Sequence, residues 1–368
     1  MLGRRVEDGV AEKSVSVGNV SFDKTKRERP QELNVFIALV LIVVVFEVLG
    51  RLVIGDSFLF NTRPDVDTLF NNQRLQIIIL QVSIVGIIAV GVTQVIISGG
   101  IDLSSGSIVG ATAMIAMSFA QTATVNDSPN PTAIFQNPAF FDLPIIVPIL
   151  VAVACGVVGG LINGSLIAYT KIPPFIATLG MMVTARGLSK WWTKGRPASF
   201  PTHEYDYIGG GLMPVIIFIV LAILFQLILT HTKYGKHCYA VGSNEEAARL
   251  SGVSIERHKM LVYSIAAILA AIAALVLSSK NLTAQAGMGV MYELDAIAMA
   301  VIGGVSLSGG RGSIIGTVFG ALIFGVIISG FTFMKLDAYY QEMVKGAIIV
   351  GAVVLDRWRE RRRAAGVK

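Results

Sequence analysis

Long apolar stretches alternate with short polar ones along most of the chain. A helix needs about 20 apolar residues to cross the hydrocarbon core of a bilayer, because its backbone must satisfy its own hydrogen bonds there. The clearest stretches predict six spans, at residues 34–54, 77–97, 143–169, 212–230, 260–279 and 314–333. Shorter or glycine-interrupted stretches predict four more, at residues 107–120, 174–192, 294–305 and 343–355. We therefore predict an all-α, polytopic transmembrane bundle of about ten spans over residues 34–356.

Composition agrees with a chain embedded in lipid. Of its 368 residues, 54% are hydrophobic and 15% are charged, which is more apolar than a soluble domain of this size requires. Cys155 and Cys238 share no disulfide-type spacing, and the four histidines form no H-x-x-x-H pair, so no metal site is expected. The net charge of +6 comes without basic patches interleaved with aromatic residues. We therefore expect the lipid bilayer, and no nucleic acid, as a partner.

The distribution of Lys and Arg predicts the orientation, because basic residues accumulate in cytoplasmic loops. Residues 1–33, 231–259 and 357–368 are basic, whereas residues 121–143 contain no Lys or Arg. Both termini are therefore expected in the cytoplasm, with residues 1–33 as a flexible segment and residues 357–368 as a basic tail. A basic cluster beside an expected external loop is the exception, and it consists of Lys190, Lys194 and Arg196.

Two glycine-rich segments about 200 residues apart, 96–110 and 301–316, resemble each other. Each is expected to join two apolar helices by a short turn on the same side of the membrane, which indicates a parallel internal repeat of helical hairpins. The turn glycines permit sharp bends and close helix packing, and they are Gly99, Gly100, Gly303 and Gly304. Asp102 is the only acid in either segment. It either locks or gates the turn at the cytoplasmic mouth, or caps the helix that follows.

Residues 242–253 have the pattern of a short isolated helix within the basic loop 231–259. Ser243 is a suitable N-cap, Glu246 three residues later would complete a capping box, and Gly252 suits the left-handed position after the last turn. So short a helix is unstable alone in water and needs a surface to pack on. No G-x-x-x-x-G-K-[ST] motif occurs in the chain, so we do not expect it to hydrolyse ATP or to act as an enzyme.

The core Glu245-Glu246-Ala247-Ala248 followed by Gly252 resembles the coupling loop of binding-protein-dependent importer permeases. Three further blocks are similar to the ribose, xylose and galactose permease family, and they span residues 99–104, 171–180 and 292–298. The similarity extends, in order, from about residue 75 to 355. The external segment 121–142 and the N-terminal extension depart from it.

The resemblance implies the permease subunit of an ATP-binding-cassette importer of a monosaccharide or sugar-like polyol in a bacterial inner membrane. A separate ATPase subunit would bind ATP and Mg, a periplasmic sugar-binding protein would deliver the solute, and a second permease chain, as a homodimer, would complete the pathway. This chain would bind no cofactor. Residues implied to couple to the ATPase are Ser243, Glu245, Glu246, Ala247, Ala248 and Gly252.

Solute contacts are expected from hydrogen-bonding groups and an aromatic platform. The candidates are Asn163, Phe175, Thr178, Trp191, Glu293 and Asp295. Each also has a structural interpretation: the aromatic side chains would face lipid, Asn163 would join two helices, and the two acids would complement a helix N-terminus.

Three other classes of protein remain open. An ion-coupled secondary transporter would carry charged groups in mid-span, and these are nearly absent from the predicted spans. A branched-chain amino-acid importer permease differs only in the sugar-type blocks, and a passive channel would have no use for the capped helix. A pentose, a hexose and a cyclitol fit the pattern equally well.

Overall fold

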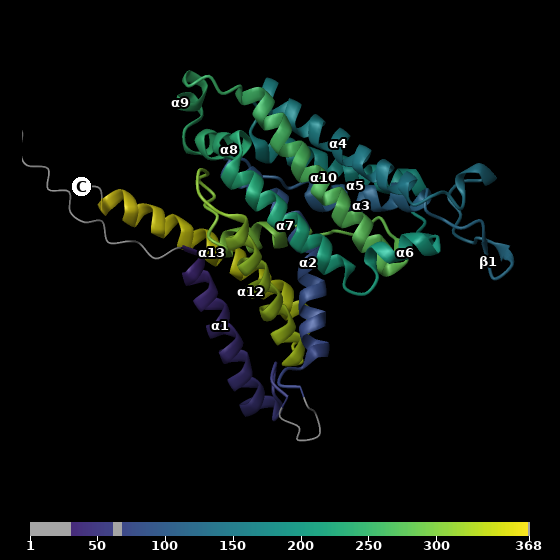
Figure 1. Cartoon of the computed structure of the whole chain (residues 1–368), viewed down its shortest axis with the longest axis horizontal. Coiled ribbons are helices and arrows are strands. Elements are labelled where there is room, and N and C mark those ends of the chain that lie inside the picture. The colour runs from purple at the N-terminus through teal and green to yellow at the C-terminus, as the bar shows by residue number, and fades with distance from the viewer. Residues whose placement is uncertain (1–30, 62–67, 367–368) are drawn as a thin grey trace, which may run out of the picture. The chain divides into compact units, whose positions relative to one another are not determined.

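The computed structural model describes residues 31–61 and 68–366, which are mostly helical (Figure 1). The helices are α1 (Gln31–Leu49), α2 (Asn72–Ile97), α3 (Ser105–Ser118), α4 (Ile146–Tyr169), α5 (Pro174–Thr193), α6 (His203–Gly209), α7 (Met213–His231), α8 (Lys233–Ser243), α9 (Glu245–Leu250), α10 (Ile255–Asn281), α11 (Tyr292–Ile302), α12 (Ile314–Phe333) and α13 (Ala338–Gly366). A π-helical turn, η1 (Gly50–Ile54), continues α1, and a 3-10 turn, η2 (Pro138–Phe140), precedes α4.

Among the described residues, six helical segments are long and apolar enough to cross a bilayer. They are Glu32–Ile54, Asn72–Ile97, Ile146–Tyr169, Met213–His231, Ile255–Asn281 and Ile314–Phe333. Each overlaps one of the six clearest predicted spans. The four weaker predicted spans fall on α3, α5, α11 and α13.

Helix α10 lies at the centre and packs along α4 through small residues. Gly156, Gly160 and Gly164 recur every four residues on α4, so they form one stripe on that helix. A Cβ atom at Gly156 would lie 2.9 Å from the backbone of α10 at Ile268, and one at Gly164 would lie 2.6 Å from the Cα of Met260. Such spacing lets two backbones approach closely, as small residues do in membrane bundles.

Helix α2 is the second central element, and it packs against α10, α11 and α12. Its residues from Val82 to Ile97 are buried, as expected of a helix surrounded by others. The hydroxyl groups of Thr93 and Thr317 hydrogen bond at 2.7 Å between α2 and α12. This polar contact ties two otherwise apolar faces together.

Short antiparallel strand pairs occur in the segments between helices, and they are the exception to the all-α prediction. Strands β1 (Thr124–Val125) and β2 (Ser128–Pro129) form one pair, and β3 (Ala198–Ser199) and β4 (Thr283–Ala284) form the other. The second pair joins the segment after α5 to the segment after α10. Helix α6 follows β3 in the chain, and Figure 1 shows α6 at the opposite end of α10 from α8 and α9.

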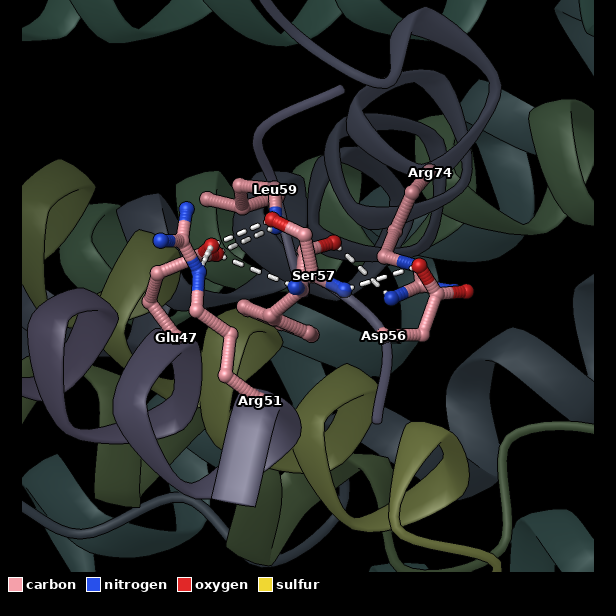
Figure 2. Close-up of polar contacts among 7 residues, drawn as sticks. Glu47, Arg51, Asp56, Ser57, Leu59 and Arg74 are labelled. Atoms are coloured by element: carbon pink, nitrogen blue, oxygen red, sulfur yellow. Dashed lines mark hydrogen bonds and ion pairs between the residues drawn. The ribbon is translucent and has the colours of Figure 1, made fainter. Parts of the chain in front are cut away.

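A buried carboxylate fastens the end of α1 (Figure 2). Glu47 accepts hydrogen bonds from the backbone amides of Phe58 and Leu59, both at 3.0 Å, and from the hydroxyl of Ser57. Arg51 donates to the same carboxylate at 3.0 Å. These bonds offset the cost of burying a charge and hold the segment after η1 against α1, which itself packs on α12.

The predicted terminal segments lie largely outside this description. Of residues 1–33, only the last three are described, as the start of α1. At the other end, α13 continues without a break from the weak span 343–355 into the basic tail, as far as Gly366.

Candidate functional site

The predicted short helix exists as α9, but its N-cap is one residue later than predicted. Helix α8 includes Ser243, so Ser243 is not available as a cap. Asn244 has an extended backbone, and its side chain accepts a hydrogen bond from the amide of Ala247 at 2.9 Å. Glu246 is therefore at the second helical position rather than the third, and the predicted capping box of Ser243 and Glu246 is wrong.

The predicted end of α9 is confirmed. Gly252 has φ = +86°, a left-handed conformation that favours glycine. The amide of Gly252 bonds to the carbonyl of Arg249 at 3.0 Å, and the amide of Val253 bonds to the carbonyl of Ala248 at 3.1 Å. The helix thus ends in a closed turn that leaves Gly252 at the surface.

The two faces of α9 differ in chemistry. Ala248 is buried against Val241 and Ile255, so it packs inward and not toward a partner. Glu245 forms an ion pair with Lys259 at 2.8 Å. The outward face is exposed at Glu246, Ala247 and Leu250, and Leu250 is 87% exposed.

Leu250 is a residue that sequence reasoning missed. A large apolar side chain at the tip of a helix, surrounded by polar residues, is typical of an anchor for another protein. The sequence did contain an indication of it, because a leucine directly precedes Ser251 and Gly252, where the polar helix ends. Beside α9, a cavity of about 290 Å³ lies against the α4–α5 connection, which includes Lys171, Pro173 and Pro174.

The two glycine-rich hairpins have matching turn geometry. In the first, the amides of Gly99 and Gly100 bond to the carbonyls of Ile96 and Val95, both at 2.9 Å. In the second, the amides of Gly304 and Val305 bond to the carbonyls of Val301 and Ala300, at 2.9 and 3.0 Å. Gly99 and Gly304 both have positive φ, at +79° and +93°. The equivalent residues are thus Gly99 and Gly304, which places Gly303 opposite Ser98.

The hairpins also contact each other and the end of α8, at a place that we name the glycine junction (Gly99, Gly242, Gly309 and Gly310). The amide of Gly310 donates to the carbonyl of Ile97 at 2.8 Å. A Cβ atom at Gly309 would lie 2.6 Å from the carbonyl oxygen of Gly242 and 3.0 Å from the Cα of Gly99. The backbones of three separate segments therefore meet at Gly99, Gly242 and Gly309.

Other bonds tie α8 to the same place. The hydroxyl of Tyr239 donates to the carbonyl of Gly312 at 2.8 Å, and that of Tyr234 donates to Gln94 of α2 at 2.9 Å. Since α9 follows α8 after one residue, α9 is linked to both hairpins through α8.

Asp102 binds the start of α3. It accepts hydrogen bonds from the amide of Ser104 at 2.8 Å and from its hydroxyl at 2.6 Å, and Asn163 of α4 donates to the same hydroxyl at 2.8 Å. Burial raises the pKa of Asp102, although the bonds from Ser104 act in the opposite direction. This arrangement supports the capping interpretation of Asp102, while a gating role stays a prediction.

Thr178 lies beside the same turn, and its hydroxyl is 3.5 Å from the carbonyl of Ile101. The structure thus brings Asn163 and Thr178 together around residues 101–104. It does not bring Phe175 and Trp191 there, because these side chains are 51% and 72% exposed on the outside of α5.

The two acids of α11 are buried and face different neighbours. Glu293 lies against Gly106 at the start of α3. Asp295 forms an ion pair with Lys345 of α13 at 3.0 Å. Both acids are also in the first turn of α11, as the helix-terminus interpretation requires.

Arg186 is a charged residue within the weaker predicted span 174–192. Arg186 donates to the carbonyls of Ala286 and Met288 at 3.0 and 2.7 Å, so it satisfies a non-helical segment that precedes α11. Nothing near Arg186 in the sequence marks partners that are 100 residues away.

Comparisons with known proteins agree with a permease. Residues 74–353 match the family model described as "Branched-chain amino acid transport system / permease component". The galactose/methyl galactoside import permease protein MglC of Escherichia coli K12 is 36% identical over 79% of this chain and 88% of its own length. The ribose import permease protein RbsC of Bacillus subtilis 168 is 36% identical over 89% of this chain and 93% of its own. No solved structure matches. With its apolar helices and this extent of similarity, the chain is a multi-pass membrane protein that belongs to this family of transport-system permease components.

Proposed function

We propose that the chain is the membrane permease subunit of an ATP-driven, binding-protein-dependent importer of a monosaccharide or sugar-like polyol. The observation that carries the proposal is the α8–α9 unit, in which a short capped helix exposes Leu250 while the preceding helix contacts both hairpins. The printed names of the relatives, import permeases for galactose and for ribose, support a sugar as cargo.

In this proposal, a separate ATPase subunit binds ATP and Mg, and this chain is neither an enzyme nor a carrier of a cofactor. Its outward α9 residues Glu246, Ala247, Leu250 and Gly252 contact the ATPase. The buried Ala248 and the Glu245–Lys259 ion pair hold α9 against the rest of the chain, and Ser243 lies against Gly310 of the second hairpin. A periplasmic sugar-binding protein delivers the solute, and a second copy of the chain completes the pathway.

The proposed topology has ten spans, with both termini in the cytoplasm of a bacterial inner membrane. The ten predicted spans coincide with ten helices, and the basic segments at both ends and around α8–α9 are then on the cytoplasmic side. The matching turns at Gly99 and Gly304 support the parallel repeat. Gly99, Gly100, Gly303 and Gly304 would serve as its turn residues.

The proposed transmission runs from α9 through α8 to the hairpins. A displacement of α9 moves α8, because one residue separates the two helices. The end of α8 contacts both hairpins through the backbone at the glycine junction, and the side chains of Tyr239 and Ser243 add contacts with the second hairpin, so both hairpins are expected to move with α8. Asp102 would then hold the first hairpin to α3 during the motion.

An ion-coupled transporter is the second candidate, and the charged groups inside the bundle favour it. Arg186 and the Asp295–Lys345 pair are such groups, but each has a protein partner. The family description also leaves a branched-chain amino acid as a rival cargo. The experiment must therefore distinguish ATP from an ion gradient as the energy source, and a sugar from a branched-chain amino acid as the solute.

We would reconstitute the chain in proteoliposomes with its ATPase and binding protein, and measure uptake of labelled D-ribose, D-galactose and L-leucine. The proposal expects sugar uptake that requires ATP and is unaffected by ionophores. Uptake driven by an ion gradient without the ATPase, or uptake of leucine alone, would refute it.

The Leu250→Asp variant tests the coupling contact in the same assay. A charge at an exposed apolar anchor should reduce ATP-driven uptake at least about tenfold without altering the folding of the bundle. Ser254→Asp is the matched control, because it adds the same charge to the same loop at the N-cap of α10, where Asp is favourable. Equal uptake by both variants would show that α9 makes no such contact.

A further inference from the structure

A cavity of about 270 Å³ lies between α2, α10, α11, α12 and α13. Its wall combines apolar and polar groups, with Phe324 and Tyr292 as aromatic members. This volume is just below the range for ligand pockets, which begins near about 300 Å³. It suits one small ring rather than an extended molecule.

The ion pair of Asp295 and Lys345 forms part of this wall. Asp295 is only 5% exposed, and Lys345 lies 5.6 Å from the centre of the Phe324 ring. A buried ion pair adds little stability compared with apolar residues of the same shape, so its presence inside a membrane bundle favours a functional role. The pair offers a carboxylate acceptor and an ammonium donor side by side.

Three further polar side chains line the cavity from α2 and the end of α10. They are Gln81, Lys280 and Asn281, and none of them has a hydrogen-bond or ion-pair partner among residues 31–61 and 68–366. The amides can both donate and accept, and the lysine donates. These groups are therefore free to bind a ligand.

This mixture matches the chemistry of a hydroxyl-rich solute. Each hydroxyl group both donates and accepts a hydrogen bond, so it needs acceptors and donors within one small space, while the apolar face of a sugar ring packs on an aromatic side chain. A purely apolar ligand would leave the side chains of Gln81, Lys280 and Asn281 without hydrogen-bond partners.

We propose that this cavity binds one monosaccharide or polyol molecule, with Asp295 and Lys345 bonding to its hydroxyl groups and Gln81 and Asn281 completing the contacts. This inference rests on the proposed function, and it names the site within the permease at which the cargo is held.

The full-length chain in phosphatidylcholine nanodiscs, without the other subunits, provides the test. Saturation-transfer-difference NMR would measure binding of D-ribose, D-galactose and myo-inositol separately. We expect at least one of them to bind, with Kd raised about tenfold in Asn281→Ala, which removes a hydrogen bond but leaves the ion pair intact. Asp295→Asn should weaken binding further.

The matched control is Gln285→Ala, which removes an exposed amide four residues beyond Asn281 and outside the cavity. It should bind like the unmodified chain. No binding of any of the three compounds, or equal Kd values in Asn281→Ala and Gln285→Ala, would overturn the proposal. Because Asp295→Asn leaves Lys345 unpaired, its folding would be checked by thermal unfolding, and Asn281→Ala decides the outcome by itself.

Two further arms separate the rival explanations. If nanodiscs with phosphatidylglycerol abolish sugar binding, the cavity is a lipid headgroup site and the proposal fails. If the reconstituted importer transports sugar with ATP, but Asn281→Ala transports at the same rate as Gln285→Ala, the proposed permease function is supported and the proposed binding site is refuted. Absence of any ATP-driven sugar uptake would instead refute the proposed function.

Discussion

At the scale of single residues, the closest backbone contacts depend on the absence of a side chain. Gly242 at the end of α8 is the clearest case, because a Cβ atom there would overlap the carbonyl oxygen of Ile97 and lie 2.6 Å from the amide nitrogen of Gly310. Both neighbours are backbone atoms that are already hydrogen bonded to each other. They have little freedom to move aside.

Gly242→Ala should therefore destabilise the protein by about 1–3 kcal/mol, as overpacked sites do, and reduce ATP-driven uptake. The measurement is the midpoint of thermal unfolding in detergent, followed by uptake in proteoliposomes. Gly187→Ala in α5 is the control, because a Cβ there meets nothing within 4 Å. If the two variants unfold at the same temperature, the glycine junction does not have the described geometry.

Cys238 provides a second test of the packing of α8. The side chain is fully buried, and burial raises the pKa of its thiol above the ordinary value of 9.0. The thiolate is the reactive form, so labelling by N-ethylmaleimide at pH 8 should be slow in the folded protein and fast after denaturation. Mass spectrometry of the peptide that contains Cys238 would measure both rates. Rapid labelling without denaturation would contradict the packing.

At the scale of secondary-structure elements, α9 depends on one cap. Its six residues are too few for independent stability, so the bond from the amide of Ala247 to Asn244 matters more than in a long helix. The position of this cap was predicted wrongly because Ser243 and Asn244 are both good N-cap residues. The choice between them depends on where α8 ends, which is set by its contacts with the hairpins.

Asn244→Ala should weaken α9 by about 1 kcal/mol, whereas Asn244→Asp should preserve the cap. Hydrogen exchange of peptides covering residues 244–253 would report the difference as about fivefold faster exchange in the alanine variant. Ser243→Ala is the comparison that separates the two possible caps. If it accelerated exchange as much as Asn244→Ala, the cap would be Ser243 after all.

Element type and position were largely predictable, because they follow from local rules. The six clearest spans follow from the length of apolar stretches, and the stop at Gly252 follows from its left-handed conformation. The partners of charged side chains were not predictable. Arg186 bonds to carbonyls 100 residues away, and Lys345 pairs with an acid 50 residues away. Such partners depend on how helices pack, which no local pattern reveals.

In the candidate site too, residue chemistry could be predicted from the sequence, whereas the position of each side chain could not. Asn163 and Thr178 were selected by residue chemistry, and packing brings them to the first hairpin. Phe175 and Trp191 were selected by the same chemistry and are exposed instead. Whether a candidate residue is buried or exposed depends on which side of its helix faces the neighbouring helices. The sequence of an apolar helix in lipid shows little periodicity from which that side could be predicted.

At the scale of the whole molecule, the proposed ten-span topology makes a direct prediction. The turn between β1 and β2 contains Asn126 and Asp127, both with positive φ, and should be external. A short epitope inserted after Asn126 should be accessible to antibody in spheroplasts, whereas an epitope after Lys368 should become accessible only after permeabilisation. Both epitopes on one side would require an even number of spans between residues 126 and 368, instead of the seven proposed.

Backbone hydrogen bonds join distant segments at both ends of the bundle, through Gly310 and Ile97 at one end and through β3 and β4 at the other. These two links would restrict movement of the linked segments against each other within one chain. Opening and closing would then fall to the seam between one chain and its neighbour. Cross-links inserted within a single chain should leave turnover intact, while cross-links between two chains should stop it.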